Sequence, residues 1–130
     1  MDVVGDFITI LRNASASKRG ACVVQWSALK ENLASILKHE GYINDYIKEQ
    51  NDKHTKFSLR IFLKYVNGVP AITEIGRVSR PGCRKYLPAN RIPAILGGIG
   101  ECILSTSKGL LSGKGAKSAG VGGELMCYVW

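Results

Sequence analysis

The sequence is poor in side chains that bind metal ions or carry out catalysis. It has only two histidines, His39 and His54, both expected to be exposed and idle, and its four cysteines form no C-x-x-C pair. Structural zinc sites take ligands at short spacing, and a nucleophile needs a base and an orienting acid beside it. Three of the cysteines lie in apolar, strand-like surroundings, so the sequence favours reduced, buried thiols and a protein with no metal or other cofactor.

Long apolar runs are also missing. No segment is long enough to span a bilayer, and no secretory h-region is found near the N-terminus. With the scattered thiols, these absences favour the reducing cytoplasm and no membrane partner.

Acidic side chains are scarce in the second half of the chain, whose overall net charge is +8. Residues 77–130 hold eight lysines and arginines against Glu101 and Glu124 alone, whereas residues 1–76 hold ten basic side chains against eight acidic ones. Such an imbalance favours a polyanionic partner, although a solvated surface explains any single lysine. Glu101 and Glu124 would form a carboxylate pair on neighbouring strands, but isolated acids in a basic segment more often form ion pairs with arginine or lysine. An enzyme is not expected.

The apolar pattern predicts an α+β fold of two small modules. Helices are expected at residues 3–15, with Asp2 as N-cap, and from Ser27 as N-cap to a stop at Gly41. Strands are expected at residues 21–26, 42–49 and 57–65. In the last of these apolar residues alternate, so that Phe57, Leu59, Ile61, Leu63 and Tyr65 are expected on one face. The turn at Asn67 to Pro70 predicts a boundary, so that residues 1–66 form an N-terminal α/β module and residues 67–130 a C-terminal β-rich module.

The expected elements of the second module are mostly strands. They are predicted at residues 71–79, 84–87 and 102–106 and from Leu125 onward. A short helix is predicted around residues 92–96, with Pro93 in its first turn, and Ser112 is expected to cap one weak turn of helix.

Two hydroxyl- and glycine-rich segments stand out in the last third of the chain. They are S-T-S-K-G at residues 105–109 and V-G-G-E-L at residues 121–125, and apolar, strand-like residues bracket both. Such residues bury little apolar surface, but they offer small donors and acceptors to a backbone that approaches closely. In a basic chain this favours nucleic-acid binding. Ser105, Thr106 and Ser107 are expected to alternate along an extended strand end.

Two further segments allow two interpretations each. The basic segment G-R-V-S-R-P-G-C-R-K-Y, residues 76–86, would place guanidinium groups beside Tyr86 for stacking, or form an ordinary solvated hairpin. Thr9, Arg12 and Asn13 share the outer face of the first helix, which is either a contact surface or plain solvent-exposed surface.

Five segments carry a resemblance to a known family. They are D-F-I-T-I-L-R-N-A, L-K-H-E-G-Y-I, R-V-S-R-P-G-C-R-K-Y, G-G-I-G-E-C-I-L-S-T-S-K-G-L-L and V-G-G-E-L-M-C-Y-V-W. Over essentially its whole length the chain resembles the bacterial family of ribosomal protein eight of the small subunit. The resemblance implies a ribosomal protein that binds the central domain of small-subunit rRNA early in assembly, beside neighbouring ribosomal proteins. Some members also repress translation of their own operon by binding a similar mRNA hairpin.

The resemblance also implies where RNA is bound. The main contact loop corresponds to Ser105, Thr106, Ser107, Lys108 and Gly109, and its neighbour to Gly122, Gly123 and Glu124. Secondary contacts correspond to Thr9, Arg12, Asn13, Lys30, Arg84 and Tyr86. The alternative is a non-catalytic interaction module that docks a protein through the C-terminal apolar strand and Trp130. Salt separates the two, because only RNA binding should weaken steeply as salt rises.

Overall fold

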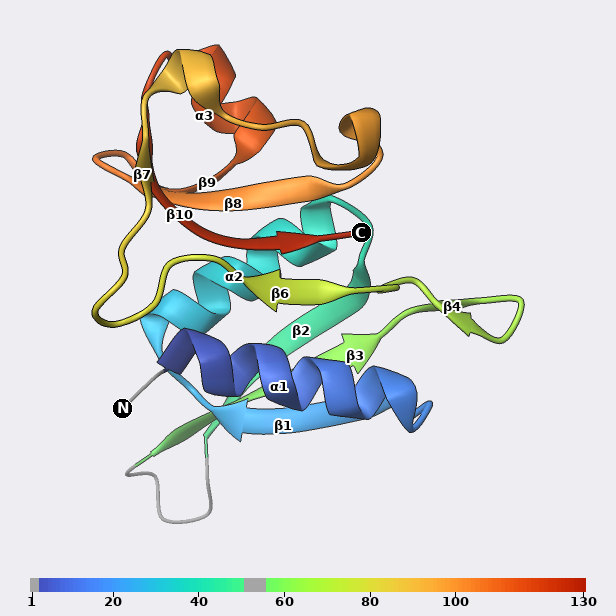
Figure 1. Ribbon diagram of the computed structural model, residues 1–130. Coiled ribbons are helices and arrows are strands. Elements are labelled where there is room, and N and C mark those ends of the chain that lie inside the picture. The colour runs from blue at the N-terminus through green and yellow to red at the C-terminus, as the bar shows by residue number, and fades with distance from the viewer. Residues whose placement is uncertain (1–2, 51–55) are drawn as a thin grey trace. The chain divides into compact units, whose positions relative to one another are not determined.

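The structure, a computed structural model, describes residues 3–50 and 56–130 (Figure 1). It confirms the α+β class. The chain divides into two compact units, residues 3–72 and 73–130. The predicted N-cap Asp2 and His54 lie outside the described residues. Among the helices that the structure describes, none is long and apolar enough to cross a membrane.

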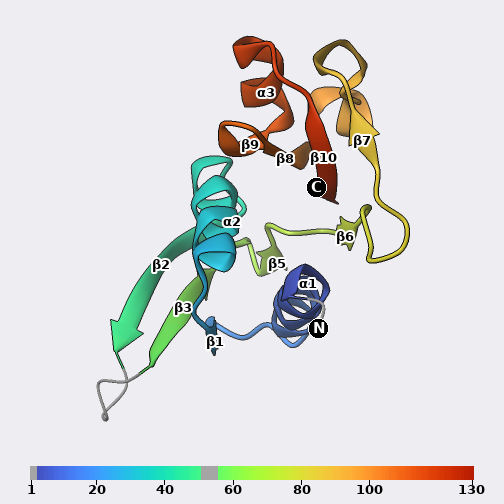
Figure 2. The ribbon, with the colours of Figure 1, turned by 90° about the vertical axis from the view of Figure 1, so that its left-hand side faces the viewer.

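The first unit is a three-stranded antiparallel sheet in the order β1-β3-β2, with two helices on one side of it (Figure 2). Its elements are α1 (Val3–Ala16), β1 (Ala21–Gln25), α2 (Ala28–His39), β2 (Ile43–Gln50) and β3 (Phe57–Leu63). The alternation predicted for β3 is confirmed at Leu59, Ile61 and Leu63, which are buried, whereas Phe57 at the start of the strand is 39% exposed.

Both predicted ends of α2 are confirmed. The Ser27 hydroxyl accepts a hydrogen bond from the Lys30 N–H at 3.2 Å, which satisfies one of the free amides of the first turn. At the other end Gly41 adopts a φ of +83°, and the Tyr42 N–H donates to the Leu37 carbonyl at 2.8 Å. This arrangement ends the helix at a residue that tolerates the left-handed conformation.

The turn at Asn67 and Gly68 belongs to the first unit. It joins the two-residue strands β4 (Tyr65–Val66) and β5 (Val69–Pro70) into a small hairpin, whose base is closed by the Ala71 N–H donating to Lys64. The hairpin lies within the first compact unit, which extends to Ile72.

The second unit is a five-stranded sheet built around its last strand. Strand β10 (Gly123–Val129) lies between β8 (Glu101–Thr106) on one side and β6 (Ile75–Arg77) and β7 (Tyr86–Leu87) on the other, and β9 (Gly109–Ser112) pairs with β8. Helix α3 (Gly113–Ala119) follows β9, and the predicted Ser112 cap is confirmed by a 3.1 Å bond from the Gly115 N–H. The core beneath α3 consists of Ile92, Cys102, Leu104, Ala116 and Leu125.

Three expectations for this unit were wrong. The helix expected at residues 92–96 is absent, because Ile92 precedes a proline and is extended, while Leu96 and Gly97 have positive φ. Two short 3₁₀ turns are found instead, Ala89–Arg91 just before that segment and Ile95–Gly98 overlapping its end. The strands expected at residues 71–79 and 84–87 are found only as the shorter strands β6 and β7.

The close approach of β10 to its neighbours generates a prediction at Gly123. A Cβ there would lie 2.2 Å from the Ser105 carbonyl oxygen, which is backbone and cannot move aside. We expect Gly123→Ala to lower the free energy of unfolding by about 1–3 kcal/mol, as overpacking does, in urea titrations. Gly20→Ala is the control, since a Cβ there meets nothing within 4 Å. If both variants are equally stable, the backbone of β8 is not packed against Gly123 as closely as described.

The cysteines generate a second prediction. Cys83 is exposed, whereas Cys22, Cys102 and Cys127 are buried. Burial raises the pKa of the Cys22 and Cys102 thiols, and raises the pKa of Cys127 to about 12. Because the thiolate is the reactive form, we expect a thiol reagent to label Cys83 first in the native protein. Cys83→Ser should abolish the fast phase. Fast labelling of any second thiol would show that the core opens.

Candidate nucleic-acid interface

The S-T-S-K-G segment forms the turn of the β8–β9 hairpin. Thr106 pairs with Gly109 at the end of the ladder, and Ser107 and Lys108 make the two-residue connection. Gly109 has a φ of +97°, a conformation that favours glycine. The side chains of Ser105, Ser107 and Lys108 are exposed. The segment therefore presents two hydroxyls and one ammonium group to solvent.

The Thr106 hydroxyl has a different role. It donates to the Gly109 carbonyl at 2.7 Å and accepts from the Lys108 N–H at 3.1 Å, so it closes the turn from within. The strand predicted at residues 102–106 does end at Thr106, so the alternation expected to continue to Ser107 was wrong. Ser107 is instead placed at the tip of a tight hairpin.

The register of the sheet brings three separate predicted segments together. Glu124 on β10 pairs with Tyr86 on β7 and with Ser105 on β8. Residues directly opposite in antiparallel strands point to the same face, so these three side chains form one row across the sheet. In the next row, Gly123 lies between Leu87 and Thr106. The candidate interface is this face together with the hairpin turn.

Arg84 joins the row through an ion pair. Its Nη1 donates to Glu124 Oε2 at 3.1 Å, and Arg84 remains about half exposed. Tyr86 is 69% exposed, so its ring is available for stacking. The carboxylate among the predicted contacts is thus neutralised by a neighbouring guanidinium group, as the sequence suggested for Glu124.

The two glycines beside the row are tightly packed. A Cβ on Gly122 would lie 2.2 Å from the Leu87 carbonyl oxygen, and a Cβ on Gly123 equally close to that of Ser105. Both positions therefore need glycine so that β7 and β8 can flank β10. Their predicted place at the interface coincides with this packing requirement.

The remaining predicted contacts lie in the first unit. Thr9, Arg12 and Asn13 are exposed on α1, where the Thr9 hydroxyl donates to the Gly5 carbonyl at 2.9 Å. Lys30, in the first turn of α2, donates from Nζ to the Gln25 carbonyl at 2.9 Å. The structure thus gathers the first three on one helix face, whereas the Lys30 ammonium group already has a partner inside its own unit.

Two features of the second unit were missed from the sequence. Ser79 is buried, and its hydroxyl accepts from the Lys85 N–H at 2.8 Å, which fixes the loop leading to Arg84. A single serine in a basic segment gives no signal of such a role. Glu101 and Glu124 do not pair, because Glu101 lies opposite Val129 at the far end of β8. Nor does Glu101 form the expected ion pair; it is buried and bonds backbone amides.

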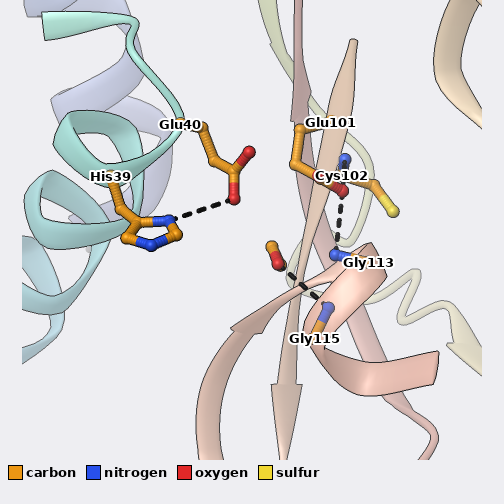
Figure 3. Close-up of polar contacts among 7 residues, drawn as sticks. His39, Glu40, Glu101, Cys102, Gly113 and Gly115 are labelled. Atoms are coloured by element: carbon orange, nitrogen blue, oxygen red, sulfur yellow. Dashed lines mark hydrogen bonds and ion pairs between the residues drawn. The ribbon is translucent and has the colours of Figure 1, made fainter. Parts of the chain in front are cut away.

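Other candidate sites find little support. Among the described residues, no group of three or more His, Cys, Asp or Glu side chains is arranged to hold a metal ion. His39 is exposed, and its Nδ1 lies 3.4 Å from the neighbouring Glu40 carboxylate (Figure 3). The docking alternative needs a free C-terminal strand, but β10 is paired on both sides and its Leu125, Cys127 and Val129 side chains are buried.

Comparison with known proteins agrees with the resemblance noted in the sequence. The family model described as ribosomal protein S8 matches residues 2–130. The small ribosomal subunit protein uS8 of Nitrosomonas europaea is 44% identical over 128 residues, covering 98% of this chain and 96% of that protein. The proteins of the same name from Persephonella marina and Vibrio cholerae are also 44% identical, over 99% and 98% of this chain and 98% and 96% of their own lengths. The chain belongs to the ribosomal protein S8 family.

Proposed function

We propose that this protein binds small-subunit rRNA directly through the face formed by β7, β10 and β8 and the adjoining β8–β9 turn. A member of the ribosomal protein S8 family is a structural constituent of the small ribosomal subunit in the cytoplasm, and not an enzyme. The RNA contact of this protein would lie in the central domain of the small-subunit rRNA, where binding helps the subunit assemble. The observation that carries the proposal is the row Tyr86–Glu124–Ser105, which unites segments far apart in the sequence.

The chemistry of this face suits folded RNA. Exposed serine hydroxyls bond 2′-OH groups and unpaired base edges, which distinguish RNA from duplex DNA. The exposed Tyr86 ring offers a stacking surface, and Lys108 and Arg84 attract phosphate. Glu124 holds the Arg84 guanidinium group in place, so that its outward N–H groups approach the backbone in one orientation.

The charge distribution supports a division of labour between the two units. Of the three acids in the second unit, Glu124 is neutralised by Arg84, Glu101 is buried and Glu74 is exposed, against eight lysines and arginines, so its surface is basic. The first unit would supply secondary contacts through Thr9, Arg12, Asn13 and Lys30 on its helices. The same face would bind the mRNA of the protein's own operon if that mRNA folds into a similar hairpin, which would repress its translation.

The proposal predicts a salt dependence. The affinity for a central-domain rRNA fragment should fall linearly in log–log form as salt rises, by roughly 0.7–0.9 per phosphate contacted. Filter binding across a salt series measures the slope, with random duplex DNA as the competitor. A salt-independent affinity, or equal binding to the DNA, would argue against a specific RNA site.

Two substitutions in the hairpin turn separate direct hydrogen bonding to the RNA from nonspecific attraction to its phosphates. Ser107→Ala removes an exposed hydroxyl without a charge, so binding should weaken by about 1–3 kcal/mol with an unchanged salt slope. Lys108→Ala should weaken cognate and random RNA alike and reduce the slope by about one contact.

Thr106→Ala is the matched control for folding in this test. Its hydroxyl closes the turn, so this substitution should lower the free energy of unfolding, whereas Ser107→Ala should not. If a folded Ser107→Ala variant binds like the unsubstituted protein, the turn does not read the RNA directly.

A further inference from the structure

Glu101 has one carboxylate oxygen that the protein does not satisfy. The side chain is 5% exposed at the start of β8. Its Oε1 accepts from the Gly113 N–H at 2.9 Å and from the Cys102 N–H at 3.2 Å (Figure 3). Its Oε2 is buried and has no hydrogen-bond partner within the part of the chain that the structure describes. Buried polar atoms nearly always have a partner, so an unpartnered carboxylate oxygen at this position needs an explanation.

The same residue lines a small pocket of about 140 Å³. The lining residues are Pro93, Ala94, Ile95, Gly98, Gly100, Glu101, Gly113, Lys114 and Lys117. The volume is well below the roughly 300–1,000 Å³ of sites for drug-sized ligands, and suits a single ring. At Gly113 a Cβ would lie 2.6 Å from the Cys102 sulfur, so glycine there keeps the wall beside Glu101 flat.

The charges around the pocket select its ligand. All three charged residues line the pocket, but Glu101 is buried, whereas Lys114 and Lys117 are exposed on α3. A simple anion would be repelled by Glu101, and a simple cation by the two lysines. A nucleotide fits both, because its base edge donates hydrogen bonds and its phosphate is anionic. Among single-ring bases, cytosine donates from its N4 amino group, the group that Glu reads in nucleic acids, whereas uracil presents an acceptor, O4, at the same position.

We propose that this pocket holds an unpaired cytidine of the bound RNA, with its amino group on Glu101 and its phosphate beside Lys114 and Lys117. The inference rests on the proposed RNA binding and adds a second, base-specific contact to it. Glu101 and the hairpin turn lie at opposite ends of β8, about 17 Å apart at the usual strand rise. One RNA loop therefore reaches both only if the cytidine is splayed away from its neighbours, as in single-stranded RNA recognition.

The loop beside the pocket supports this assignment. Leu96 has a φ of +48°, which is unusual for a residue with a side chain, and it is 53% exposed. Ile99 is 82% exposed. The loop is therefore strained and exposes two apolar side chains next to the residues that line the pocket. Both properties are typical of a surface that contacts a bound ligand.

A nucleotide titration of the full-length protein tests the proposal. The amide resonances of Gly113 and Cys102 report on Glu101, since both amides bond its Oε1. We expect 5′-CMP to shift them with an affinity about tenfold higher than that of 5′-UMP, because the amino donor is exchanged for an acceptor facing a carboxylate. Cytidine without phosphate should bind more weakly than 5′-CMP, and Lys117→Ala should remove that difference.

A substitution at Glu101 sharpens the test. Glu101→Gln keeps the shape and can offer an N–H to uracil O4, so the preference for 5′-CMP should disappear or reverse. Glu74→Gln is the matched control, because it removes the same charge from an exposed site of this unit that does not line the pocket. If Glu101→Gln fails to fold, the affinities of 5′-CMP and 5′-UMP for the unsubstituted protein still show whether the pocket prefers cytidine.

Other outcomes overturn the proposal. Equal affinity for both nucleotides would exclude reading by Glu101, and shifts produced by Mg²⁺ alone but not by 5′-CMP would indicate a cation site. No shift with any ligand would mean that only water occupies the pocket. If 5′-CMP causes no shift while rRNA still binds with the expected salt dependence, only the cytidine site is refuted. If rRNA binding does not depend on salt, the proposed function itself is refuted.

Discussion

The close packing of β10 between its neighbours is the constraint on which the second unit depends. At Gly122 and Gly123 the flanking carbonyl oxygens of Leu87 and Ser105 come so near that no side chain fits. Because these glycines let β7 and β8 pair with the same strand, Tyr86, Glu124 and Ser105 fall into one row. The candidate interface is thus a product of backbone crowding, and it would not exist if β10 were an edge strand.

The sheet built around β10 also holds two acids of the second unit, Glu124 and Glu101. Glu124 is held beside Arg84 in an ion pair whose arginine is half exposed, and such a pair contributes little to stability. The ion pair instead orients the Arg84 side chain, because it restricts the conformations of this long basic group at the surface. Glu101 is buried against backbone amides. Two of the three acids of this unit therefore take little from its positive surface charge, whereas the third, Glu74, is exposed.

Local signals were readable from the sequence, whereas pairing between distant segments was not. The Ser27 cap, the Gly41 stop and the alternation along β3 depend on residues within a few positions, and all three were predicted correctly. Strand β9 was missed because Gly109 to Ser112 has neither alternation nor strong strand formers, and it is a strand only through its register with β8. The row at the interface likewise depends on register, which a single sequence does not reveal.

The hydroxyl- and glycine-rich segments serve the fold and the surface at the same time. Of the three hydroxyls in S-T-S, that of Thr106 is used within the turn, while those of Ser105 and Ser107 remain exposed. Gly109 has a left-handed φ, whereas Gly123 makes room for a neighbouring strand. Identical residue types in one short segment thus meet different physical demands. Composition alone locates such a surface, but only the hydrogen bonds and the register distinguish the groups that are free to bind from those that hold the surface in shape.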